Sequence, residues 1–421
     1  MAVTGQDEFY TYDGLSQLTD FQRGTLNAND TGLTGTPAWE EDFTFDPTGN
    51  WQQYVNQVNG QVTLDQARTH NPVNEILTIG GSGSLIQQDP AGNIIKAPQP
   101  ANWSKAYTLT YDAWNRLVQV KNGSKLVATY AYDGQNWRIT KTAGNTTRDY
   151  YYTSQWQIVE EQVTAGTPDR QYVWGLLGSD NLVLRDRPAL NERFYAFSDT
   201  VSVTAIADAN GNVQERYGYN AYGTPLFMTP AFVLLASSQF DWRTLYDSYH
   251  YDGESGFYQV RNRYLHPALG RWLIRDPLEQ MATLEGADVF IKVLEIIGLN
   301  LYEYVENNPF NNYDPLGLSG GKGNIGQARC CLKTELMATY CYGGIWACIV
   351  AYFNEYTLVA ATLIGDATGV TAIVYPPGAY VSVATNVYDL GIAFEGLVLC
   401  TTKTVCLKRT GGQFQGDLHC D

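Results

Sequence analysis

A short turn-like motif recurs along the first half of this 421-residue sequence and limits the folds that the chain can adopt. YDAWNRL at residues 111–117 is echoed by YDGQNWRI at residues 132–139, and the two Asp residues are 21 positions apart. Shorter copies centre on Asp13, Asp46, Asp89 and Asp208. Recurrence at a loose period near twenty residues is the signature of a repeat architecture.

Each copy predicts a strand, a turn and a second strand. The Asp side chain can close a turn on its own backbone, and a neighbouring Gly or Asn tolerates positive φ. Asn59-Gly60 and Asn122-Gly123 are hairpin dipeptides between runs rich in Val, Tyr and Thr. We therefore expect a mainly β chain in which residues 1–240 form a YD-repeat array of chained hairpins. A twisted sheet of many strands curls, so the array should form a curling sheet or a partial β-shell.

Composition narrows the functional classes. The chain carries 27 basic and 43 acidic residues, a formal net charge of −16, and 44% of its residues are hydrophobic. That hydrophobic fraction excludes wholesale disorder. Nucleic-acid binding is disfavoured, because neutralising phosphates needs clustered Lys and Arg. No basic segment followed by an apolar run stands at the start, so the sequence as written shows no signal peptide.

A second, ordered series of motifs follows the repeats. Its members are NAYG at 220–223, GFY at 256–258, RNRY at 261–264, LGRW at 269–272, RDPL at 275–278, NLYEYV at 300–305, NNP at 307–309 and DPLGL at 314–318. One YD unit alone would be weak evidence, but the ordered series is specific. The repeats resemble those of Rhs (rearrangement hotspot) proteins, and the series resembles their repeat-associated core domain. The resemblance covers about three quarters of the chain and stops at Leu318.

The resemblance implies an architecture. Rhs proteins, and the related C component of insecticidal toxin complexes, wind their YD hairpins into a hollow β-shell. The core domain, here residues 241–318, plugs one end, and a variable C-terminal segment is held inside. Full shells use far longer chains, so the resemblance also implies that another chain could complete the shell. It further implies a secreted or cell-surface location.

The resemblance also implies a chemical site. In toxin-complex relatives the core domain cuts its own chain after the last Leu of DPxGL, which corresponds here to the bond Leu318–Ser319. By motif, the catalytic residues would be Asp276 and Asp314, with Arg275 beside them. Two coupled carboxyl groups can have different pKa values, so that one activates water while the other protonates the leaving group. The alternative interpretation is that both Asp-Pro pairs only start turns.

Residues 319–421 form a tail of different composition. All seven Cys lie after residue 329, and residues 336–402 contain no Lys or Arg. We expect a small, Cys-containing, α-rich C-terminal domain, a candidate passenger or toxin. Two alternatives stay open: a membrane-active segment, and a tail with no fold of its own. The tail carries no recognisable enzyme signature, and its Cys spacings do not fit a zinc site.

Three functions follow from these features. The first is an Rhs-type carrier that encloses or presents a variable C-terminal effector and releases it by self-cleavage after Leu318. The second is a cell-surface adhesion or carbohydrate-binding module, and the third is a relic fragment of a larger Rhs protein. Enzymatic activity would be at most a single-turnover, aspartyl-protease-like self-cleavage. We expect no cofactor and no metal. The partners left open are a second chain and a carbohydrate or target-cell surface.

Overall fold

The structure is a computed structural model, and it is almost entirely antiparallel β. In full it describes residues 5–163, 166–175, 180–278 and 300–318. Beyond residue 318 it describes only the backbones of short strands. The chain divides into two compact units, Met1–Gly323 and Asn324–Asp421.

Three larger antiparallel sheets and one two-stranded sheet are described in the first unit. The six-stranded sheet contains β1 (Asp7–Tyr12), β2 (Leu18–Gly24), β3 (Trp39–Phe45), β4 (Trp51–Val58), β5 (Gln61–His70) and β6 (Ile76–Ile79). The fifteen-stranded sheet contains β7 (Gln87–Gln88), β8 (Ile94–Gln99), β9 (Asn102–Tyr111), β10 (Leu117–Asn122), β11 (Lys125–Tyr132), β12 (Arg138–Ala143), β13 (Thr146–Tyr152), β14 (Ile158–Val163), β15 (Pro168–Trp174), β16 (Leu182–Arg187), β17 (Glu192–Asp199), β18 (Ser202–Ala207), β19 (Val213–Tyr219), β20 (Pro225–Met228) and β21 (Leu234–Leu235). The four-stranded sheet contains β22 (His250–Asp252), β23 (Phe257–Val260), β24 (Arg263–His266) and β25 (Arg271–Trp272).

Strand order follows the sequence in every one of these sheets, as expected for chained hairpins. Between their described strands, none of the three closes on itself: β1 and β6 end the six-stranded sheet, and β7 and β21 end the fifteen-stranded one. The prediction of a mainly β chain is confirmed, and the array forms open sheets.

The repeated Asp closes its turn with its own side chain. In the copy at Asp46, carboxylate Oδ1 accepts hydrogen bonds from the backbone N–H groups of Thr48 (2.8 Å) and Asn50 (3.0 Å). Gly49 adopts the positive φ (+80°) that the turn requires. The same two bonds, to the second and fourth following residues, recur at Asp13, Asp89, Asp112, Asp133 and Asp208. The predicted turn is thus confirmed at each of these Asp residues.

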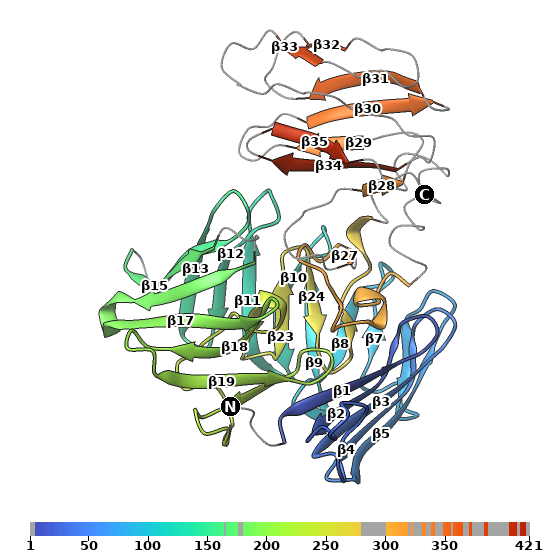
Figure 1. Cartoon of the computed structure of the whole chain (residues 1–421), viewed down its shortest axis with the longest axis vertical. Coiled ribbons are helices and arrows are strands. Elements are labelled where there is room, and N and C mark those ends of the chain that lie inside the picture. Colours follow the sequence, from blue (N-terminus) through green and yellow to red (C-terminus); the bar gives the residue numbers. More distant parts are fainter. Residues whose placement is uncertain are drawn as a thin grey trace. The chain divides into compact units, whose positions relative to one another are not determined.

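The segment after residue 241 lies against both large sheets. Figure 1 shows β23 and β24 between the strands of the long sheet and those of β1 to β5. His266 of β24 bonds the Pro98 carbonyl of β8 (Nε2–O 2.8 Å), and Arg68 of β5 donates to the carbonyl of Leu269 (2.9 Å). Trp51 of β4 donates from its indole to Asn307 (3.1 Å). The core segment therefore joins the two sheets.

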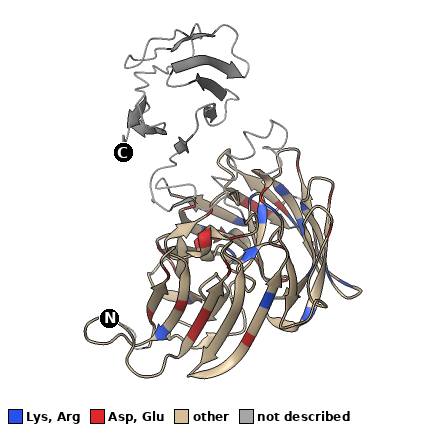
Figure 2. Cartoon of the chain, turned by 90° about the vertical axis from the view of Figure 1, so that its right-hand side faces the viewer, with Lys and Arg blue, Asp and Glu red and all other residues tan. Residues whose placement is uncertain are grey.

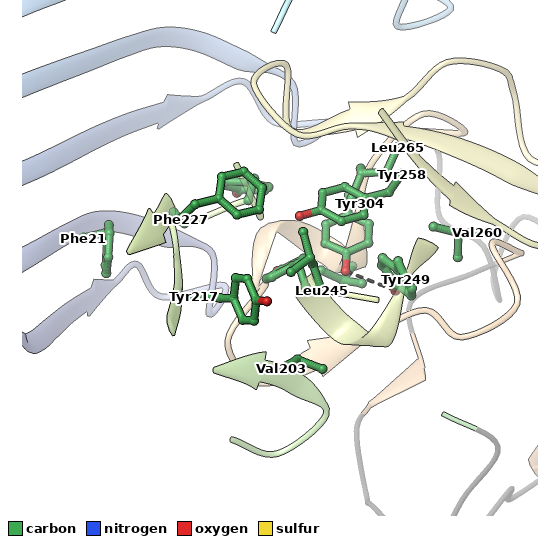
Figure 3. Packing of buried hydrophobic residues seen from close by; sticks show 14 of the residues in the cluster. Phe21, Val203, Tyr217, Phe227, Leu245, Tyr249, Tyr258, Val260, Leu265 and Tyr304 are labelled. Carbon is green, nitrogen blue, oxygen red and sulfur yellow. Dashed lines mark hydrogen bonds between the residues drawn. The ribbon is translucent and has the colours of Figure 1, made fainter. Parts of the chain in front are cut away.

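Aromatic side chains fill the space between these elements. Tyr249, Tyr258 and Tyr304 of the core segment pack with Leu245 and with residues of β18 to β20 (Figure 3). Figure 3 also shows the hydrogen bond between the hydroxyls of Tyr249 and Tyr304, which are 3.2 Å apart. These Tyr side chains combine an apolar ring with a hydroxyl group, and the hydroxyls of Tyr249, Tyr258 and Tyr304 all form hydrogen bonds.

Buried ion pairs add a second link between sheet and core segment. Asp252 of β22 contacts Arg138 and Lys141 of β12, with 2.7 Å between its Oδ1 and the Lys141 ammonium nitrogen. All three side chains are at most 2% exposed. Figure 2 shows basic and acidic residues interspersed along the strands. The charges thus serve internal pairing as well as the surface.

The predicted α-rich fold of the tail concerns residues that lie outside the described ones. The tail segments with a described backbone are strands in small sheets. They are β27 (Gly321–Lys322), which pairs with β26 (Asn312–Tyr313), and β28 (Cys331–Lys333), β29 (Ala338–Cys341), β30 (Cys348–Asn354), β31 (Thr357–Ile364), β32 (Val370–Ala372), β33 (Val383–Thr385), β34 (Thr404–Thr410) and β35 (Gln413–Asp417).

Candidate functional site

The two predicted catalytic aspartates are brought together at one buried cation. Asp276 follows β25, and Asp314 follows β26, 38 residues later in the sequence. Nitrogen Nη2 of Arg263, the first residue of β24, lies 2.8 Å from Oδ2 of Asp276 and 3.1 Å from Oδ2 of Asp314. The three side chains are at most 4% exposed. Both carboxyl groups are thus within hydrogen-bond reach of the same nitrogen.

Arg263 was not singled out by the sequence reasoning. Its guanidinium group lies over the indole ring of Trp272 at 4.3 Å from the ring centroid, which fixes the plane of the group. Nitrogen Nε of Arg263 donates to the carbonyl oxygen of Gly317 (2.6 Å). One side chain therefore contacts both carboxyl groups and the backbone just before the predicted cleavage bond. In the sequence, Arg263 stands out only as a member of the RNRY motif, which does not show that it contacts Asp276 or Asp314.

Arg275, the predicted basic partner, makes contacts on the repeat side of the core segment. It donates to Oε1 of Glu75 (3.2 Å) and to the hydroxyl of Tyr302 (3.3 Å), and its side chain is 26% exposed. Tyr302 also donates to the carbonyl of Gly92, in the turn of the Asp89 repeat. These contacts tie the RDPL motif to the repeat array.

The DPLGL loop folds back on its own aspartate. Oxygen Oδ1 of Asp314 accepts a hydrogen bond from the backbone N–H of Leu318 (3.2 Å). Gly317 has a φ of +64°, and a Cβ at this position would lie 2.5 Å from the carbonyl oxygen of Val260. Only glycine fits here, for both reasons. Leu318 is thus held by the predicted catalytic group, whereas Ser319 lies outside the described residues.

Burial raises the pKa values of two carboxyl groups at this loop, those of Asp314 and Asp247. Burial raises the pKa of Asp314, although Arg263 opposes the shift. Tyr249 donates to the carbonyl oxygen of Asp314 and accepts from its N–H (both 2.9 Å), and Tyr304 links Tyr249 to Asp247. Burial raises the pKa of Asp247 to about 7. A carboxyl group that keeps its proton near neutral pH can act as an acid.

One cluster of three carboxylates in the described part of the chain has the spacing of a cation site. Asp20, Glu40 and Asp42, on β2 and β3, offer oxygens that lie within 4.8 Å of one another. Burial and the two neighbouring carboxylates raise the pKa of Asp20 to about 7. Burial, together with repulsion among the three carboxylates, explains the raised pKa without an ion. Among the described helices, none is long and apolar enough to cross a lipid bilayer.

Comparison with known proteins places the chain among repeat proteins. The family model described as RHS Repeat matches residues 111–148. The tRNA3(Ser)-specific nuclease WapA of Bacillus spizizenii is 29% identical over 279 residues, which is 66% of this chain and 11% of that protein. The toxin subunit YenC1 of Yersinia entomophaga is 27% identical over 245 residues, 51% of this chain and 22% of that protein. The chain thus spans about a tenth to a fifth of the length of these relatives.

Solved structures share the fold. The Tc holotoxin pore of Photorhabdus luminescens, with a substituted TccC3, superposes with a TM-score of 0.54 at 20% identity, covering 76% of this chain and 16% of that chain. The TcdB2–TccC3–Cdc42 complex gives a TM-score of 0.51 at 21% identity, covering 74% of this chain and 15% of that chain.

The open antiparallel sheets of Asp-closed hairpins, with a core segment packed against them, define a β-repeat protein whose fold these solved structures share. The chain carries an RHS repeat and is similar to Rhs (YD) repeat proteins, and those relatives include a nuclease and a toxin subunit.

Proposed function

We propose that this chain is an Rhs-type carrier whose core domain, residues 241–318, cuts the bond Leu318–Ser319 and so releases the variable tail, residues 319–421. The observation that carries the proposal is the convergence of Asp276 and Asp314 on one Arg263 nitrogen, with the N–H of Leu318 bonded to Asp314. If Asp276 and Asp314 only started turns, they would not need to share the buried guanidinium group of Arg263.

The step is the hydrolysis of one peptide bond. A water molecule adds its oxygen to the carbonyl carbon of Leu318, and the carboxylate of Asp276 takes the proton that this water loses. Asp314, whose raised pKa suits the acid, gives its proton to the nitrogen of Ser319 as the C–N bond breaks. The products are a new carboxyl terminus at Leu318 and a new amino terminus at Ser319, and each chain reacts once.

The intact mass of the denatured chain tests this proposal. The wild type should give two fragments, residues 1–318 and 319–421, whereas Asp276→Asn and Asp314→Asn should each give one uncut chain. The matched control is Asp65→Asn, an exposed residue of β5, which should be cut like the wild type. An uncut wild type would refute self-cleavage and leave both aspartates as turn residues.

Assembly and location extend the proposal. The TcdB2–TccC3 structures contain a partner chain, and the sheets of this chain end in open edges at β1 and β21. We expect a second chain to complete the shell, and we expect the protein to act as a secreted or cell-surface component.

A carbohydrate-binding role is the second candidate, and one observation favours it. A cleft of about 470 Å³ lies between the turns of three repeats and the core segment, and Trp114, Arg116 and Tyr132 line it. Trp114 is 74% exposed, and an open indole face can stack on a sugar ring. A Trp114→Ala variant that keeps all binding to a glycan array would remove this candidate.

A further inference from the structure

Three consecutive residues of the core segment hold three consecutive carbonyl groups ahead of the predicted cleavage bond. Arg261 and Asn262 form the turn between β23 and β24, and Arg263 begins β24. Arg261 donates from Nη1 to the carbonyl of Pro315. Asn262 donates to the carbonyl of Leu316 from both its backbone N–H (3.2 Å) and its Nδ2 (2.9 Å). Arg263 donates from Nε to the carbonyl of Gly317 (2.6 Å).

These donors are themselves fixed in place. Arg261 forms an ion pair with Asp180 (2.7 Å), and Asn262 accepts a hydrogen bond from Asn136, in a repeat turn (2.9 Å). Arg263 lies on Trp272. A turn whose side chains are already ordered loses little entropy when it holds a peptide. The repeat array, through Asn136, therefore helps to order the turn.

We propose that the turn at residues 261–263 is a backbone clamp that positions the cleavage segment, residues 315–317, for Asp276 and Asp314. This inference rests on the proposed self-cleavage. Each hydrogen bond from the clamp to residues 315–317 is accepted by a main-chain carbonyl on the amino-terminal side of the bond Leu318–Ser319. The clamp therefore holds the segment through its backbone at residues 315–317. Such a clamp would work with tails of different sequence.

The physical reason for a clamp is the rate of the cleavage step. Holding the reacting groups of one chain in the correct geometry raises the rate of an intramolecular reaction by orders of magnitude. Arg263 adds a second effect, because the same guanidinium group that holds Gly317 also contacts both carboxyl groups. The clamp residues act through the segment and the aspartates, so they are positioning residues and not catalytic ones.

The test follows self-cleavage of the full chain during cell-free synthesis, with intact mass measured over time. Asn262→Asp keeps the size of the side chain, its acceptor for Asn136 and the backbone N–H bond to Leu316, but it loses the side-chain donor to Leu316 and places a carboxylate beside that carbonyl. We expect cleavage at least tenfold slower. Cleavage of Arg263→Gln should be slower still. Arg263→Lys keeps the charge and one donor nitrogen, and its cleavage rate should recover in part. Such a graded recovery would not follow from a loss of fold.

Two control variants match these changes. Asn27→Asp makes the same charge change in the loop after β2, and Arg271→Gln removes a buried Arg of the same small sheet that donates to the carbonyl of Asn74. Both should cleave within twofold of the wild type. The urea midpoint of each variant, measured in an Asp314→Asn background, should show that the fold persists.

The outcomes separate the two claims. If the wild type cleaves and the folded Asn262→Asp and Arg263→Gln variants cleave at the same rate, the clamp is overturned and the proposed function stands. If the wild type never cleaves, the proposed function fails and the positioning role fails with it. Hydrogen exchange of the Leu318 amide should also be faster in Asn262→Asp than in Asn27→Asp, and equal exchange would count against a clamp.

Discussion

The buried ion pairs of Asp252 give the sharpest prediction about how the core segment is held in the sheet. Asp252→Asn leaves Arg138, which is fully buried, and Lys141, which is 2% exposed, without their shared carboxylate. Lys141 keeps a contact to Glu254 at 2.9 Å, and Arg138 keeps the hydroxyl of Tyr264 at 3.0 Å. Removing one partner of a buried ion pair costs about 3–5 kcal/mol, because a buried charge stays uncompensated. We expect a loss of unfolding free energy in this range.

The assay is urea unfolding followed by tryptophan fluorescence. A loss of about 4 kcal/mol moves the midpoint by about 2 M when the urea slope is near 2 kcal/mol per M. Asp65→Asn serves as the control, because this exposed side chain can still accept from Gln53. Replacing both members of the pair, Asp252→Leu with Arg138→Met, should recover part of the loss. A folded Asp252→Asn variant that loses less than 1 kcal/mol would refute the reasoning.

Three further predictions concern the turn, the loop and the buried acid. Asp46→Ala removes acceptors of two backbone N–H groups and should cost about 2 kcal/mol in urea unfolding. Gly317→Ala should slow self-cleavage strongly, as measured by intact mass, because the added Cβ would meet the carbonyl of Val260 at 2.5 Å. Asp247 has a pKa raised to about 7, so its contribution to stability is present below about pH 4 and is lost as the pH rises to 7. Between pH 5 and 7 the wild type should lose about 2–3 kcal/mol of unfolding free energy relative to Asp247→Asn, at about 1.4 kcal/mol per pH unit; parallel pH curves would contradict this pKa.

Much of the repeat array could be predicted, because its turns depend on a local side-chain bond. Other turns in the described part of the chain have no Asp at this position. Asn27, Asn71, Thr153 and Ser238 accept the same bonds from the second and fourth following residues, with an amide oxygen or a hydroxyl. Asn71 falls in the long gap between Asp46 and Asp89. The turn needs only an acceptor at this position, so a search for Asp misses these copies.

One hairpin turn is shifted by a residue from its predicted centre. Asn59 and Gly60 form the two-residue loop between β4 and β5, both with positive φ, as predicted. In the other hairpin Asn122 pairs with Lys125, so the loop consists of Gly123 and Ser124. A dipeptide signal fixes that a hairpin forms, but the pairing of the flanking strands decides its register.

The site was predictable only in part, because its members are distant in sequence. The motifs indicated Asp276 and Asp314 as a pair, but a separation of 38 residues in the sequence does not show that the two side chains lie close together in the fold. Arg263 joins them because β24 pairs with β25 and β23, which places its side chain next to Trp272. The clamp at residues 261–263 depends on carbonyl groups, and main-chain contacts leave no mark in the sequence except the glycine at 317.

The most direct test of the account is the identity of the fragment ends after synthesis in water enriched in heavy oxygen. The account predicts that the larger fragment ends at Leu318 and carries one heavy oxygen atom in its new carboxyl group, and that the smaller one begins at Ser319. The same cut should persist when residues 320–421 are replaced by an unrelated protein. A fragment with another end, or a chain that stays whole, would contradict it.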